Sequence, residues 1–158
     1  MPKLYQLRNI LSDKNKKLIY VAWVESLLLY GIEVYGFASK YIIERLQRTQ
    51  NRIVKILFHR CDTTNDCYSK NNILRIIQLR DYRIVLKNFF TFKDKKPLVR
   101  DGTLRDSSIK YKLPLYRNDY GTRNKAYYLP NIFNKFPSTF YAIKKHGELK
   151  IKLKQALK

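Results

Sequence analysis

The sequence predicts a mainly α protein in which a small helical bundle comes first and a less regular region follows. Apolar residues recur at three- and four-residue steps in several long runs, which is the helical period. Hydrophobic residues make up 45% of the 158 residues, which is enough to bury a core. We therefore expect a bundle of about four helices over residues 1–94, a linker over 95–115, and an irregular Tyr- and Pro-rich segment over 116–158 that is closed by a basic helix.

Two helices are expected before the first glycine. Residues 3–11 form a short helical run, and Ser12 can cap a second helix over residues 13–30. The second half of that helix is apolar nearly all round, which is typical of the buried centre of a bundle. Gly31 is the expected end of this helix and Gly36 marks a second break, so the chain turns between them.

The stretch from Ser39 to Phe58 is the clearest amphipathic helix in the chain, with Ser39 as its expected N-cap. One face is apolar and is expected to join the core: Ile42, Ile43, Leu46, Ile53, Val54 and Leu57. Almost opposite lies a narrow cationic stripe: Arg45, Arg48, Arg52 and Lys55. Two interpretations of the cationic stripe stay open, an ordinary solvated face or a rail that follows a phosphate backbone.

Beyond this helix, polar and helical stretches alternate. A polar loop follows Phe58, and a further helical run extends from about 70 to 94, with a break expected at 76–78. Residues 94–112 are polar and charged, which is typical of a flexible linker. The tail, residues 142–158, is a basic amphipathic run and supplies the expected C-terminal helix.

The net charge indicates the class of partner. Lys and Arg number 33 against 12 Asp and Glu, which gives a formal charge of +21. A charge this large repels itself in a compact chain, so a polyanionic partner is expected, nucleic acid first and an anionic membrane surface second. A/T-rich codons offer a neutral explanation for the many lysines, but they explain a patterned arginine stripe less well.

Residues suited to catalysis are scarce, so we expect neither an enzyme nor a cofactor. The five glycines are scattered and form no phosphate-binding loop, and no paired carboxylates are placed for two-metal chemistry. His59, Cys61 and Cys67 cluster as H-x-C-x5-C, a spacing unlike that of zinc knuckles. We interpret this stretch as a loop with free thiols and expect no metal site.

The sequence also bears on location. Two cysteines fit a reducing, intracellular compartment, in the nucleus or the cytoplasm. Lys3 and Arg8 interrupt any apolar run at the N-terminus, so no signal peptide is expected. The longest apolar stretch, from Leu18 to Tyr30, is short and contains Glu25, so we expect no stable membrane insertion.

Aromatic and cationic side chains alternate in the segment 116–128, which we call the aromatic–basic segment. Unpaired bases stack on tyrosine rings, and Arg and Lys bind the phosphates between them. Packing of these rings onto the bundle is an equal alternative, and both roles are compatible because a ring has two faces. The residues that carry this prediction are Tyr116, Arg117, Tyr120, Arg123, Lys125, Tyr127 and Tyr128.

A series of strings stands in a definite order along the chain: LLLYGIEVYG, LQRTQNRIVKILF, ILRIIQLRDYRIVLKNFF, YGTRN, FNKFPS and LKIKLKQAL. Together they resemble the C-terminal part of reverse transcriptases from non-LTR retrotransposons of the Jockey-like, insect type. LQRTQNRIVKILF and YGTRN carry the resemblance most strongly. FNKFPS departs slightly, because that family usually has Trp or Tyr before the Asn and Leu before the Pro.

The resemblance implies a role for the chain. In that family this region follows the palm and contains the thumb, a helical bundle that grips the template–primer duplex and helps select the element RNA. By this analogy the cationic stripe would follow an RNA or DNA backbone, and the polymerase palm would be a second partner. The palm aspartates of a motif such as (F/Y)xDD are absent here, so no polymerase activity is expected of the isolated chain. A fragment of a longer gene, a truncated element and a co-opted remnant all fit this pattern.

A second hypothesis comes from another class of protein. A helical module that binds acidic proteins or anionic membranes would also carry a high positive charge. Arginines beside tyrosines favour nucleic acid over membranes, because guanidinium groups bind phosphates bidentately and stack on rings. Sequence specificity and oligomeric state have no signature in the chain.

Overall fold

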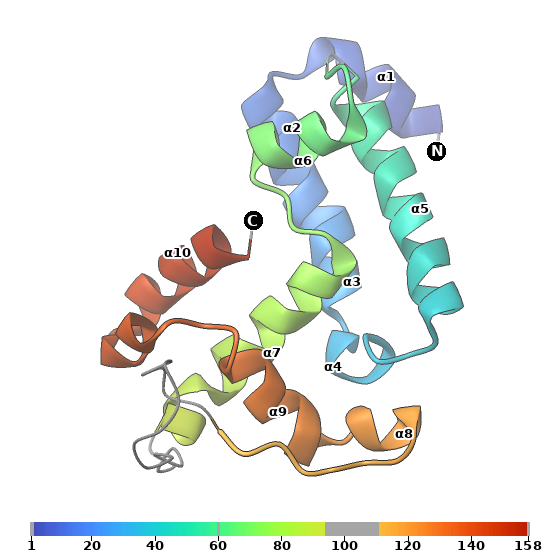
Figure 1. The fold of residues 1–158 in the computed structure, drawn as a ribbon. Helices are drawn as coiled ribbons and strands as arrows, with labels where there is room; N and C mark the ends of the chain where they lie inside the picture. The colour runs from blue at the N-terminus through green and yellow to red at the C-terminus, as the bar shows by residue number, and fades with distance from the viewer. Residues whose placement is uncertain (1, 60, 94–110, 158) are drawn as a thin grey trace. The chain divides into compact units, whose positions relative to one another are not determined.

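The computed structural model describes residues 2–59, 61–93 and 111–157, and within these ranges it contains helices and no strands. The predicted mainly α class is therefore confirmed (Figure 1). The chain divides into two compact units, an N-terminal unit up to Arg80 and a C-terminal unit from Asp81 to Leu157. Most of the expected linker, residues 95–115, lies outside the described residues, so the division into 1–94, 95–115 and 116–158 stays a prediction.

The N-terminal unit opens with two helical segments, as predicted. Helix α1 is followed by one continuous helical rod made of α2, the π-helix η1 and α3. The Ser12 hydroxyl caps α2 by accepting a hydrogen bond from the Asn15 N–H at 3.4 Å. Gly31 ends the rod with φ of 68°, the left-handed conformation that favours glycine. The bounds are α1 Pro2–Ile10, α2 Asp13–Ile19, η1 Tyr20–Glu25, α3 Ser26–Leu29 and α4 Ile32–Tyr35.

The α2–α3 rod is not buried all round, so the expectation of a fully buried central helix is wrong. Its inner side carries Lys16, Tyr20 and Leu28, which are buried and lie four and eight residues apart in the sequence. The opposite side, which includes Trp23 and Leu27, is exposed. Apolar composition alone does not tell how many sides of a helix find a partner, and here the described part of the chain covers one side.

Helix α5, Lys40–Leu57, confirms the predicted amphipathic helix. Its apolar side joins a core formed by Tyr20, Val54, Leu57, Phe58, Cys67, Tyr68 and Ile73. Two details differ from the prediction. Ile42 lies at the edge of the apolar side, 52% exposed, and Ser39 occupies the N-cap position without a side-chain capping bond.

A short helix, α6 (Thr64–Asn71), replaces part of the expected polar loop after Phe58. Thr63 and Asp66 form a capping box, in which each side chain accepts a hydrogen bond from the backbone N–H of the other. Asn72, with φ of 53°, then ends α6. The break in the expected 70–94 run therefore lies before Ile76, where α7 (Ile76–Lys93) begins, rather than at 76–78.

The C-terminal unit is more helical than expected. After the second half of α7 come α8 (Asp119–Thr122), α9 (Lys125–Phe133), the 3-10 helix η2 (Ser138–Ala142) and α10 (His146–Ala156). The expectation of an irregular segment is wrong for residues 119–133, because the side chains of Asn118 and Asn124 cap α8 and α9. The basic C-terminal helix is confirmed as α10.

Aromatic rings form the core of the C-terminal unit. Phe92 stacks on Phe133 with ring centroids 4.5 Å apart, and Tyr111 lies 4.5 Å from Phe92. Asn134 holds Tyr111 by both amide atoms, accepting from its N–H at 2.7 Å and donating to its carbonyl at 2.9 Å. The string FNKFPS, which begins at Phe133, therefore contributes to packing and to fixing the chain at Tyr111.

Candidate functional site

The cationic stripe on α5 is the strongest candidate site in the N-terminal unit. Its residues, Arg45, Arg48, Arg52 and Lys55, are all exposed. Among the described residues none of the four forms an ion pair, and the guanidinium of Arg45 lies 5.9 Å from the centre of the Tyr41 ring. Unpaired cations on one face of a regular helix are available to an external anion.

Gln50 fixes which side of α5 faces the core. Its side chain is buried, and Nε2 donates to the Tyr20 hydroxyl at 2.8 Å and to the Leu74 carbonyl at 2.9 Å. These bonds connect α5 to the α2–α3 rod and to the segment before α7. Burial also raises the pKa of Tyr20 to about 12, so the phenol stays protonated at neutral pH.

A second set of polar contacts extends this connection. Gln47 Nε2 donates to Gln50 Oε1 at 2.9 Å, and its Oε1 accepts from the Ile76 N–H at 3.1 Å. The hydroxyl of the buried Tyr68 donates to Asn51 Oδ1 at 2.8 Å, and burial raises the pKa of that phenol. Because three amide side chains on the inner side of α5 have partners, the helix cannot rotate without breaking them.

Sequence reasoning missed these amide residues. Gln47, Gln50 and Asn51 follow the same three- and four-residue steps as the apolar face, which is the available signal. Amide side chains are normally assigned to the surface, and the partner of Gln50, Tyr20, is thirty residues away in the sequence. The polar contacts therefore become visible only in the fold.

Two other arginines of the N-terminal unit, Arg75 and Arg80, make structural contacts. Arg80 donates from Nη1 to the Gly36 carbonyl at 3.1 Å and lies over the Phe37 ring at 4.8 Å. Arg75 donates from Nη2 to Asn65 Oδ1 at 2.6 Å. Neither guanidinium is as available to a ligand as those of the cationic stripe.

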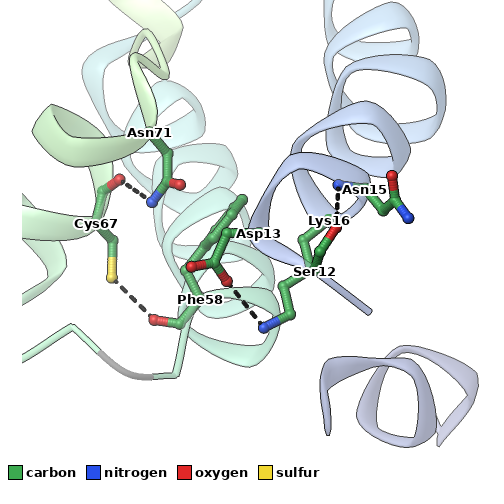
Figure 2. Close-up of polar contacts among 7 residues, drawn as sticks. All are labelled: Ser12, Asp13, Asn15, Lys16, Phe58, Cys67 and Asn71. Carbon is green, nitrogen blue, oxygen red and sulfur yellow. Dashed lines mark hydrogen bonds and ion pairs between the residues drawn. The ribbon is translucent and has the colours of Figure 1, made fainter. Parts of the chain in front are cut away.

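The cysteine-containing stretch packs against the core. Cys67 is buried, and its thiol donates to the Phe58 carbonyl at 3.3 Å, as Figure 2 shows beside the ion pair between the buried Lys16 and the exposed Asp13. Burial raises the pKa of Cys67 to about 12. Cys61 packs against the same core, and both cysteines are free thiols, while His59 is exposed. In the described ranges no three His, Cys, Asp or Glu side chains are grouped as metal ligands.

The aromatic–basic segment lies in the C-terminal unit and is built on two asparagine caps. Asn118 Oδ1 accepts from the Gly121 N–H at 2.9 Å, and Asn124 Oδ1 accepts from the Ala126 N–H at 2.9 Å. The ring of Tyr116 lies so close to Gly121 that any side chain there would clash with it. The string YGTRN thus forms a tight helical turn of defined shape.

Two kinds of tyrosine are found in this segment. Tyr120 is 77% exposed, and the guanidinium of Arg123 lies 5.2 Å from its ring centre. Tyr127 is half-buried and contacts Tyr116 edge to face, with centroids 6.0 Å apart. Tyr128 is also half-buried, whereas the flanking cations are exposed: Arg117, Arg123 and Lys125. Stacking is therefore most accessible at Tyr120, and packing explains Tyr127.

Comparisons with known proteins show a similarity over part of the chain. A Caenorhabditis elegans protein described as uncharacterized is 30% identical to this chain over 99 residues. The aligned part is 56% of this chain and 50% of that protein, so the chain spans about half the length of the relative. No protein-family model and no solved structure matches the chain. No helix in the described part is long and apolar enough to cross a membrane.

Proposed function

We propose that the chain binds nucleic acid without catalysing a reaction on it, and that the cationic stripe of α5 contacts the phosphate backbone. The observation that carries this proposal is the exposure of all four cations on one face of a helix whose other face is held by buried hydrogen bonds. A rigid helix presents its charges at fixed spacing, so it loses little entropy when it binds a regular anion.

The dimensions of the stripe suit a phosphate backbone. From Arg45 to Lys55 the helix rises by roughly 15 Å at about 1.5 Å per residue. This length corresponds to several phosphates along one strand. The formal charge of +21 adds a long-range attraction for any polyanion.

The aromatic–basic segment supports the same proposal from the C-terminal unit. The exposed Tyr120 ring with Arg123 beside it offers a stacking surface and a cation together. We propose that this segment binds unpaired nucleotides, and that the ligand is RNA or an RNA–DNA template–primer, as the resemblance to a reverse-transcriptase thumb implies. The polymerase palm would then be the natural protein partner.

Direct binding competition tests this function. Fluorescence anisotropy of a labelled RNA hairpin and a labelled RNA–DNA hybrid duplex is measured with the full chain, purified free of nucleic acid. The proposal expects saturable binding that weakens steeply with salt and that unlabelled RNA competes away. Binding to anionic vesicles that RNA fails to displace, without binding to either labelled ligand, would favour the membrane-binding alternative and contradict the proposal.

A further inference from the structure

The α2–α3 rod exposes an apolar surface that is independent of the cationic stripe. Buried positions follow one another along this rod in steps of four residues, from Lys16 through Tyr20 to Leu28. The π-helix η1 in the middle of the rod has a wider turn than an α-helix, which keeps these buried positions in line. Leu18, two residues from both Lys16 and Tyr20, therefore lies on the opposite side, and Tyr30 directly follows the end of the rod. This surface, which we call the outer face, consists of Leu18, Ala22, Trp23, Leu27 and Tyr30, all exposed.

The outer face is comparable in area to the largest apolar patch of a typical monomer, a kind of patch that is often functional. Leu18, Trp23, Leu27 and Tyr30 are 71%, 60%, 72% and 84% exposed. Aromatic side chains each present about 150–250 Å² and leucines somewhat less, so the exposed surface of these four side chains is roughly 500 Å². Apolar patches on monomers reach about 300–600 Å². Because one partner in a standard interface buries about 800 Å², the outer face supplies more than half of what a stable dimer needs.

We propose that the outer face binds a second copy of this chain, with the two rods antiparallel and Ala22 at their crossing point. A small residue at the crossing lets the helices approach closely. Ser26, whose hydroxyl donates back to the Ala22 carbonyl, is compact as well and meets Leu18 of the second copy. The larger side chains, Trp23 and Leu27, then flank the crossing on both sides.

Charge selects the antiparallel direction. With Ala22 at the crossing, Lys14 of one copy lies opposite Tyr30 of the other, which is a cation–π pair. The stem of Lys17 lies opposite Leu27, where its methylene groups can cover apolar surface. Parallel rods would instead place Lys14 against Lys14, and like charges in contact cost several kcal/mol.

The same charge distribution disfavours a membrane as the partner of the outer face. The cations Lys14 and Lys17 lie at one end of the rod, while Glu25 lies toward its other end and Glu33 follows in α4. An anionic surface attracts the first end and repels the second, whereas an antiparallel copy brings the basic end of each rod to the acidic end of the other. Two chains of charge +21 repel each other at long range, so salt should strengthen this dimer while it weakens nucleic-acid binding.

Sedimentation velocity of the full chain, freed of nucleic acid, tests the proposal at low and high salt. We expect a concentration-dependent dimer that forms more readily at high salt. Trp23 is the sole tryptophan, so its emission reports directly on the outer face and should shift to shorter wavelength as the dimer forms. Ala22→Glu places two carboxylates at the crossing and should weaken association at least about tenfold.

Two further variants keep the test decisive. Ala126→Glu makes the same substitution at an exposed site in α9 and should associate like the wild type. Lys14→Glu should weaken association even if Ala22→Glu perturbs the helix, because Lys14 is exposed. A wild type that stays monomeric throughout the micromolar range would overturn the proposal. So would equal association of all variants, or a Trp23 shift with anionic vesicles in a chain that does not self-associate.

Discussion

At the residue scale, Gln50 has the largest consequence for the proposed site. A glutamine on the apolar side of α5 gives its amide protons to the Tyr20 hydroxyl and the Leu74 carbonyl, and this fixes the direction in which the cationic stripe points. The stripe itself could be predicted from spacing, because helical geometry alone places its members on one face. The role of Gln50 could not be predicted in this way, because its hydrogen-bond partners are distant in the sequence.

Replacing Gln50 with leucine tests this role. Leucine is more apolar and similar in size, yet it would leave a buried hydroxyl and a buried carbonyl without their donor. We expect the free energy of unfolding to fall by about 1–3 kcal/mol in urea titrations. Gln6→Leu, at an exposed position in α1, serves as the control and should change stability little. Equal stability of the two variants would mean that Gln50 is not needed to hold α5.

Because Tyr20 is buried, we expect the folded chain to lose stability at alkaline pH. Its pKa is raised by burial from 10.0 to about 12 in the folded chain, whereas in the unfolded chain the phenol ionises near 10. The unfolded state therefore loses its proton first, so stability is unaffected below pH 10 and falls between pH 10 and 12. The contribution of this one group is about 1.4 kcal/mol per pH unit within that window.

Tyr20→Phe isolates this contribution. The variant loses one hydrogen bond at neutral pH, which costs about 1 kcal/mol, but it has no proton to lose. We expect urea unfolding from pH about 9 to about 11 to show a shallower decline for the variant than for the wild type. Parallel curves would show that Tyr20 does not govern the alkaline transition. The buried Tyr68 and the half-buried Tyr141, whose pKa values are also raised by burial, remain in both proteins as a common background.

At the scale of elements, the two tyrosine roles in the aromatic–basic segment can be separated. Tyr120 is exposed beside Arg123, while Tyr127 packs on Tyr116. Stacking contributes about 1–3 kcal/mol per base, so Tyr120→Leu should lower affinity for single-stranded RNA at least several-fold without changing thermal stability.

Tyr127→Leu supplies the matched comparison. It removes an edge-to-face contact that contributes about 0.5–1.5 kcal/mol, so it should lower the melting temperature and leave affinity nearly unchanged. The double variant should bind RNA as weakly as Tyr120→Leu alone. Anisotropy and thermal circular dichroism measure the two effects. If Tyr120→Leu folds normally and binds as tightly as the wild type, the segment has only a packing role.

Elements with strong periodicity were predictable, and elements that depend on caps were not. Helices α5 and α10 repeat apolar residues over several turns, and both were expected close to their observed bounds. Helices α6, α8 and α9 are short and depend on polar caps from Thr63, Asn118 and Asn124. A polar cap in a polar stretch is also typical of a loop, so length and composition favoured the wrong assignment.

The exposure of the α2–α3 rod illustrates a different limit. Its sequence is apolar nearly all round, which is equally compatible with a helix buried within one chain and a helix that pairs with another molecule. Only the fold shows that a single inner stripe, including Tyr20 and Leu28, is covered by the described part of the chain. The number of partners around a helix is a property of the assembly and leaves no local trace in the sequence.

At the scale of the whole molecule, the proposed function depends on the net charge and on where the cations lie. Most of the +21 charge acts at long range on any polyanion, so total charge alone cannot show that one surface binds. A cation that contacts a phosphate displaces a bound counterion, and this contribution appears in the salt dependence of affinity. The salt slope therefore distinguishes a contact surface from general attraction.

The most direct test compares salt slopes for two quadruple variants of equal charge. The first changes the cationic stripe to glutamine at Arg45, Arg48, Arg52 and Lys55. The control changes four exposed lysines of the C-terminal unit to glutamine: Lys112, Lys144, Lys145 and Lys150. The melting temperature should change little in either variant, because glutamine is compatible with helices and all eight side chains are exposed.

The measurement is the affinity for a labelled duplex as a function of salt concentration. Each lost phosphate contact flattens the log–log slope by about 0.9 for duplex DNA, so the stripe variant should lose roughly two to four units of slope. The control variant should keep a slope close to that of the wild type. If the stripe variant is folded and binds as tightly as the wild type with the same slope, the cationic stripe is only a solvated face and the proposed function is contradicted.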